Sequence, residues 1–102
     1  MSMLHIVNKS PFERMAFESC LNHASPGDSI LMIEDAVVGA IRHTQFAARV
    51  EAALKDKSVY VLSADLAARG LGEDRIIAGI TAVDYAGFVD LTVDNDKVQS
   101  WL

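Results

Sequence analysis

The sequence predicts an α/β domain of three layers, with helices on both faces of a mostly parallel sheet of five strands. Short apolar runs typical of strands alternate with helix-forming segments along the whole chain, which is the pattern of sheets built by right-handed crossovers. One run, residues 29–33, shows no polar alternation, as is typical of a strand buried on both faces. Glu34 and Asp35 follow it directly, at the edge where such sheets bind ligands. The architecture is flavodoxin-like in the broad sense.

Length, composition and charge limit the classes of protein to consider. The 102 residues are expected to form one domain, residues 1–102, large enough for a core. An apolar content of 51% with few aromatic residues indicates buried surface beyond that core, as at a subunit interface. No apolar run approaches the roughly 20 residues of a membrane helix, and the amino terminus does not read as a signal peptide. We therefore expect a cytoplasmic protein without membrane contact. The net charge of −5 disfavours direct binding to nucleic acid.

The first strand and helix are predicted at residues 3–7 and 11–24. Ser10 stands at an N-cap position, Pro11 at the first helical position and Glu13 three residues after the cap, which together form a capping box. At 100° per residue, one half of this helix is apolar. That half contains Phe12, Ala16, Phe17, Cys20, Leu21 and Ala24.

The middle of the chain predicts two helices and a strand. Asp35 is expected to cap a short helix over residues 36–41, and a second helix is expected from Phe46 to about Leu54. Residues 58–62 are β-branched and aromatic, as is typical of a strand.

A brief helix over residues 64–69 is expected next, capped by Ser63 and closed by Gly70. Residues 71–79 are expected to form an irregular loop, and residues 80–83 a short fourth strand.

The last helix is predicted to begin on an Asp84 cap and to run to about Asp94. Its inner face is expected to be formed by Tyr85, Phe88, Val89, Leu91 and Thr92. Residues 97–102 are expected to form a fifth, edge strand, with Trp101 buried against that edge or against another chain.

The sequence resembles the DsrH/TusB family over nearly its whole length. The resemblance is carried by residues 4–11, 34–37, 59–62, 65–70 and 83–92 and by Trp101. It implies a DsrE/DsrF/DsrH-like fold and a small cytoplasmic subunit of a heterohexameric sulfur-relay complex. Two homologous sister subunits, one DsrE/TusD-like and one DsrF/TusC-like, complete such a complex, which also meets sulfur donor and acceptor proteins. Relay complexes of this kind pass persulfide sulfur toward 2-thiolation of the wobble uridine of certain tRNAs, or serve dissimilatory sulfur oxidation.

Cys20 is the only cysteine and so the only candidate persulfide carrier, because the thiolate is the nucleophile in sulfur transfer. The resemblance implies that the principal carrier cysteine lies on a sister subunit. It also implies that the sulfur-oxidation branch has a cysteine in this helix, so Cys20 favours that branch without deciding between the two. A structural role for Cys20 is the equal alternative, because Cys20 lies within the apolar half of its helix, where burial raises the pKa of a thiol. A lone cysteine also excludes an internal disulfide and a zinc site of several thiolates.

The other polar candidates are read mainly as structural residues. His23, three residues after Cys20, could supply a positive charge to the thiol, but a solvated side chain is favoured. His5 is expected to be packed in its strand and His43 to be a loop residue. The acids Glu34, Asp35, Asp65 and Asp84 have no histidine at ligand spacing, so we expect no metal. The glycine-poor, acidic loops after the strands disfavour a phosphate-bearing cofactor, and we expect none.

Two hypotheses therefore remain open. In the first, the chain carries sulfur on Cys20 as a member of the relay, although not as a stand-alone enzyme. In the second, it is a non-catalytic structural subunit that assembles with the sister chains and stabilises them. Transfer RNA is expected to meet the complex and to touch this chain only indirectly.

Overall fold

A computed structural model of the chain describes residues 2–101. Its sheet has five strands in the order β4-β3-β2-β1-β5, and all neighbouring strands are parallel. The predicted α/β fold with a five-stranded sheet is confirmed. The strands are β1 Met3–Val7, β2 Ser29–Met32, β3 Ser58–Leu62, β4 Thr81–Val83 and β5 Lys97–Trp101.

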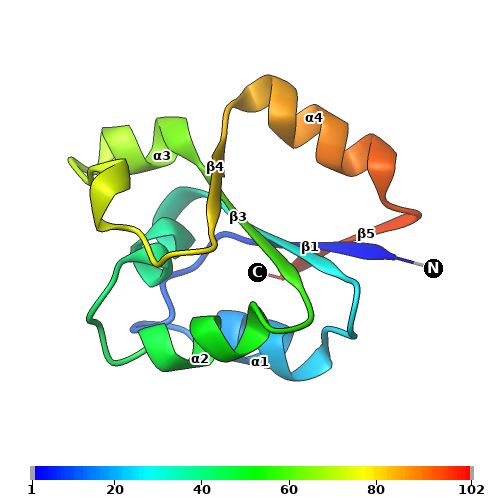
Figure 1. Cartoon of the computed structure of the whole chain (residues 1–102), viewed down its shortest axis with the longest axis horizontal. Helices are drawn as coiled ribbons and strands as arrows, with labels where there is room; N and C mark the ends of the chain where they lie inside the picture. The colour runs from blue at the N-terminus through cyan, green and yellow to red at the C-terminus, as the bar shows by residue number, and fades with distance from the viewer. Residues whose placement is uncertain (1, 102) are drawn as a thin grey trace.

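The helices lie on both faces of this sheet, with α1 and α2 on one face and α4 on the other (Figure 1). Within residues 2–101, none of them is long and apolar enough to cross a membrane. The α-helices are α1 Ala16–His23, α2 Ala47–Ala53, α3 Ser63–Ala68 and α4 Tyr85–Asp94, and the 3₁₀ helices are η1 Glu34–Ala40 and η2 Glu73–Arg75.

The first face of the sheet carries the larger part of the core. Ile30, Met32 and Val61 project from the central strands and are buried against Phe17 of α1 and Val50 of α2. Leu66, the buried residue of α3, belongs to the same cluster.

The second face is covered by one helix. From β1 to β4 the chain moves step by step in one direction across the sheet, and only the connection from β4 to β5 returns. Right-handed crossovers place connections of opposite direction on opposite faces, so α4 alone crosses the second face. Its core is correspondingly small, with Leu4, Leu31 and Leu91 buried and Tyr60 and Phe88 partly buried.

The first helix begins later than the sequence predicts. Residues 11–13 form a separate turn, in which Ser10 Oγ accepts a hydrogen bond from Phe12 N at 3.2 Å, and α1 starts only at Ala16. The turn is held by tertiary contacts: Phe12 meets Phe46 edge to face, and Pro11 lies close to Gly39. A capping box describes local preference, and here these distant contacts override it.

Of the other three predicted caps, those of Asp35 and Ser63 are also wrong. Asp35 lies inside the first turn of η1 without capping it, and its carboxylate pairs with Arg69 at 2.8 Å. Ser63 is the first residue of α3, and its hydroxyl donates to the Val83 carbonyl at 3.0 Å. Asp84 does cap α4, because its Oδ1 accepts from Gly87 N at 2.8 Å.

The side of α4 that faces the sheet is only partly the one that the sequence predicts. Phe88 and Leu91 face the sheet as expected, but Tyr85 and Val89 are 62% and 60% exposed. Gly87 sets this orientation, since a methyl group there would lie 2.9 Å from Cβ of Val83. The bare backbone at Gly87 therefore faces β4 and turns Tyr85 and Val89 outward.

We predict that Gly39→Ala lowers the free energy of unfolding by about 1–3 kcal/mol, the usual cost of overpacking a core. An added Cβ would lie 2.9 Å from the ring of Phe17 and 3.2 Å from Cγ of Pro11. Urea titration followed by circular dichroism measures the effect. The cost should shrink in a Phe17→Leu background, where the ring is absent. A Gly39→Ala chain more stable than the wild type would contradict the close contact.

Candidate functional site

Cys20, the candidate sulfur carrier, lies on the inner side of α1. Its side chain is fully buried in the first-face core. Burial, and secondarily the negative charge of Asp28, raises the pKa of the Cys20 thiol to about 12. Sulfur transfer requires an accessible thiolate, and both the burial and the raised pKa of Cys20 oppose that requirement.

His23 lies one turn further along α1 and is exposed. Its Nδ1–H donates to the carbonyl of Ser19 at 3.0 Å, and its ring lies 5.5 Å from the ring of Trp101 between centroids. These contacts orient His23 toward β5. The supporting role for the thiol that the sequence suggested stays a prediction.

A buried network at the amino-terminal end of the sheet was missed by the sequence reasoning. His5 is 3% exposed, and its Nε2 lies 2.8 Å from Oδ2 of Asp28. The indole N–H of Trp101 donates to His5 Nδ1 at 3.0 Å. Because the indole only donates and an ionised carboxylate only accepts, the imidazole of His5 is neutral with its proton on Nε2. The three side chains thus join β1, β5 and the start of β2.

Asp28 is the centre of this network. Besides His5, its carboxylate accepts hydrogen bonds from Ser25 N at 2.9 Å and Met3 N at 3.2 Å. Burial opposes ionisation, but the bonds from His5, Ser25 and Met3 outweigh it, and the pKa of Asp28 lies below its ordinary value of 3.8. A sequence signal was present: Asp28 directly precedes Ser29, whose strand pairs with β1, so the two strand starts had to lie together.

The carboxyl edge of the sheet is acidic and internally paired. Arg69 Nη2 contacts Asp35 Oδ1 at 2.8 Å, and Asp65 Oδ2 accepts from Glu34 N at 2.7 Å. This bond supports the left-handed backbone of Glu34, with φ 49°. Within residues 2–101, no three His, Cys, Asp or Glu side chains gather as metal ligands would. The carboxylates of Asp35 and Asp65 therefore bind Arg69, and that of Asp65 also binds the backbone of Glu34.

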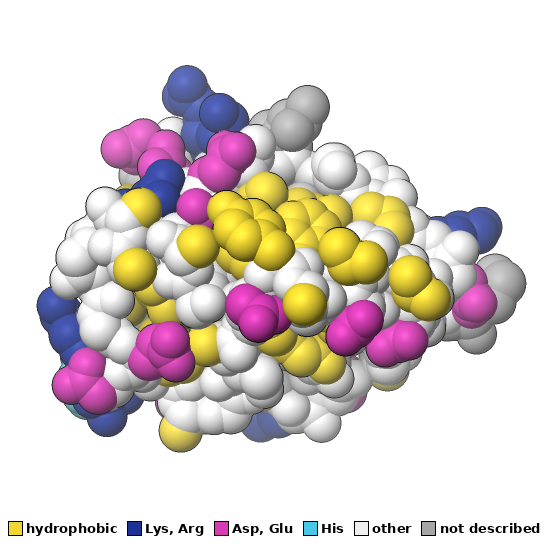
Figure 2. All heavy atoms as spheres, turned by 90° about the horizontal axis from the view of Figure 1, so that it is seen from above, with side chains coloured by type: hydrophobic (Ala, Val, Ile, Leu, Met, Phe, Trp, Pro, Cys, Tyr) yellow, Lys and Arg dark blue, Asp and Glu magenta, His cyan; other side chains and the backbone are white. Residues whose placement is uncertain are grey.

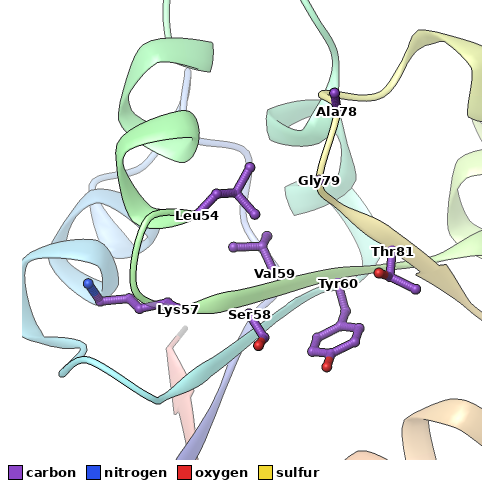
Figure 3. A pocket seen from close by; sticks show the side chains of 8 residues that line it. All are labelled: Leu54, Lys57, Ser58, Val59, Tyr60, Ala78, Gly79 and Thr81. Atoms are coloured by element: carbon purple, nitrogen blue, oxygen red, sulfur yellow. The ribbon is translucent and has the colours of Figure 1, made fainter.

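An open pocket of about 260 Å³ lies at the opposite end of the sheet, between the end of α2, the start of β3 and the chain entering β4 (Figure 3). Leu54 and Val59 form its apolar wall, and Ser58 and Thr81 supply hydroxyls. The Lys57 ammonium pairs with Asp56. In Figure 3 the Lys57 side chain points away from Ser58 and Thr81, so the amine and the two hydroxyls do not converge.

His43 occupies an exposed loop in the left-handed conformation, with φ 67°. It borders a wider hollow of about 460 Å³ together with Arg42, Glu51 and Ile77. The loop position expected from the sequence is confirmed.

Comparison with known sequences connects the chain to one family. The DsrH-like protein family matches residues 9–98. The chain is similar to TusB of Buchnera aphidicola subsp. Baizongia pistaciae, with 36% identity over 99 residues. It is 35% identical to TusB of an Escherichia coli O81 strain and 34% identical to TusB of Shigella flexneri, each over 99 residues. Each of the three alignments covers 97% of this chain and 100% of the relative.

Solved structures with low sequence identity share the fold. The ychN protein of E. coli superimposes with a TM-score of 0.76 at 16% identity, covering 99% of this chain and 100% of that one. A protein of unknown function from Methanobacterium thermoautotrophicum gives a TM-score of 0.72 at 15% identity, with 96% of each chain covered.

The Asp28 network predicts a specific acid sensitivity. A carboxyl group whose pKa is depressed by folding stabilises the fold above its unfolded pKa and loses that contribution as pH falls through the folded value. We therefore expect the urea midpoint of the wild type to drop as pH falls below 3.8, the ordinary pKa of Asp28. Asp28→Asn should flatten this decline and cost about 1–3 kcal/mol at pH 7, because it weakens bonds made to a buried charge.

Asp56→Asn is the matched control for that prediction, since Asp56 forms an exposed pair with Lys57. The Asp56→Asn variant should show the same decline of the urea midpoint at acid pH as the wild type. If the urea midpoint declines equally with falling pH in the wild type and in Asp28→Asn, Asp28 is not the source of the acid sensitivity.

Burial of Cys20 predicts slow labelling by thiol reagents. Because this is the only cysteine, the reaction of a thiol-specific dye reports on it alone. Labelling of the folded isolated chain should be at least about a thousandfold slower than in denaturant, since it requires opening of the α1 packing. Fast labelling in native buffer would show that α1 leaves the thiol accessible.

Proposed function

This chain belongs to the DsrH/TusB family, and from that membership we propose that it is a subunit of a complex that relays protein-bound persulfide sulfur. Its partners are two homologous sister chains, one DsrE/TusD-like and one DsrF/TusC-like, in a cytoplasmic heterohexamer. Sulfur donor and acceptor proteins meet this complex, and transfer RNA meets it without direct contact to this acidic chain. The relatives described above are all named TusB, which supports 2-thiolation of tRNA over sulfur oxidation as the destination.

Within the complex, we propose that this chain assembles and stabilises the sister chains and does not itself carry sulfur. One observation supports this division most strongly, namely that the thiol of Cys20 is fully buried with its pKa raised to about 12. A carrier must attack a sulfane sulfur as a thiolate and later be attacked in turn. Both steps require access to the thiol, and the packing of Cys20 between α1 and the sheet therefore supports the structural role.

The alternative, in which Cys20 loads sulfur, requires α1 to open in the complex. His23 would then be the group available to lower the thiol pKa. The two versions of the proposal differ in one measurable property, the mass of this chain after exposure to a persulfide donor.

We predict that Cys20→Ala leaves sulfur transfer by the whole complex within about twofold of wild type. The side chain packs in the core, so the substitution removes little beyond a small apolar group. The co-purified complex should be treated with a persulfide donor and each chain weighed intact, before and after a reductant. Sulfur should appear on a sister chain and not on this one.

Two controls make the outcome decisive. Omission of this chain from the co-expression should abolish transfer to tRNA if assembly is its role. Replacement of the sister chain's carrier cysteine by serine should abolish loading. If this chain gains the mass of a sulfur atom and the reductant removes it, Cys20 carries sulfur and the purely structural role is wrong.

A further inference from the structure

The outward side of α4 carries large apolar side chains, whereas α1 and α2 expose none. Tyr85, Val89 and Val93 are 62%, 60% and 76% exposed, and they recur every fourth residue, so they form one stripe along the helix. By contrast, the exposed residues of α1 and α2 are small or polar, namely Asn22, His23, Ala48, Glu51 and Ala52. Since Phe88 and Leu91 face the core, α4 is apolar on two opposite sides, which is typical of a helix buried on both.

The sheet beneath α4 is also incompletely covered. A helix about 10 Å wide lies over a sheet whose outer strands are about 19 Å apart. The strand register places Tyr60, Thr81 and Val98 on this second face. Thr81 and Val98 stay exposed and Tyr60 only half-buried. This face of the sheet therefore leaves side chains of β3, β4 and β5 uncovered.

The charge beside the stripe is of one sign. Asp90 and Asp94 are exposed and lie one helical turn apart, along the edge of the stripe. The helix α4 contains no Lys or Arg. Among residues 2–101, neither carboxylate takes part in an ion pair. Figure 2, which looks down on α4, shows apolar side chains gathered along the helix with acidic side chains below them.

From this surface we infer that α4 is the docking helix for a different chain, whose apolar strip covers Tyr85, Val89 and Val93 and whose Lys or Arg side chains meet Asp90 and Asp94. A second copy of this chain is a poor occupant, because pairing two α4 helices would bring together only carboxylates and no cation. The inference rests on the proposed function, in that the different chain is one of the two sister subunits. We call Tyr85, Val89, Val93, Asp90 and Asp94 the α4 surface.

The test uses the tagged chain co-expressed with both sister chains and purified as a complex. Val89→Arg should reduce the recovery of a sister chain at least tenfold, because it places a charge at the centre of the apolar stripe. The double variant Asp90→Lys/Asp94→Lys should also reduce it at least tenfold, because it opposes the partner's cations. Raising the salt concentration should weaken the wild-type complex more than a complex with Asp90→Asn/Asp94→Asn.

Matched controls lie on α2, on the opposite layer. Ala52→Arg and Glu51→Lys introduce the same kinds of charge at exposed positions and should leave recovery within twofold of wild type. All variants should retain the wild-type thermal midpoint within a few degrees as isolated chains, since none alters a buried residue.

The outcomes separate the two levels of the proposal. Wild-type recovery with Val89→Arg, while the wild type itself assembles, would overturn the α4 surface and leave the sulfur-relay assignment intact. A wild-type chain that recovers neither sister chain would overturn the proposed function and this inference with it. Sedimentation velocity of the isolated chain tests whether a second copy covers the α4 surface. If the wild type is a dimer and Val89→Arg is a monomer, the partner on this surface is a second copy and not a different chain.

Discussion

The complete burial of β2 is the constraint on which the rest of this fold depends. All four residues from Ser29 to Met32 are buried, so apolar layers must cover the sheet on both sides. The chain meets that requirement unevenly, because its first four strands are laid down in one direction and right-handed crossovers then place their connections on the same face. One face receives α1, η1 and α2, and the other receives α4 alone.

This asymmetry explains both the buried cysteine and the exposed stripe. On the well-covered face, α1 packs so that Phe17 and Cys20 are fully buried, and a thiol in that layer is shielded from other proteins. On the sparsely covered face, α4 presents Tyr85, Val89 and Val93 to solvent. The chain thus buries its only cysteine on one face and exposes apolar side chains on the other, an arrangement that supports the proposal of an assembling subunit.

The Asp28, His5 and Trp101 network holds the two ends of the chain together at the amino-terminal side of the sheet. It joins residues that lie up to 96 positions apart, and it anchors the edge strand β5 through a side chain that is otherwise only half-buried. Because Asp28 also accepts from Met3 N and Ser25 N, one ionised carboxylate connects the first strand with the turn after α1. The ionisable groups buried here stabilise the fold, while the edge where ligands usually bind is occupied by acids paired with Arg69.

The sequence alone determined which segments form strands and helices and in what order, because apolar periodicity, glycine and proline positions and the Asp84 cap act within a few residues. It also placed Cys20 on the apolar half of its helix and indicated the family. Only the tertiary structure decided where α1 begins, which side of α4 faces the sheet and what Asp35 and Ser63 bind. Each of these depends on a partner distant in sequence, such as Phe46 for Phe12, Arg69 for Asp35 and Val83 for Ser63. Local preferences cannot specify such partners, since the contacts form only when the sheet brings the segments together.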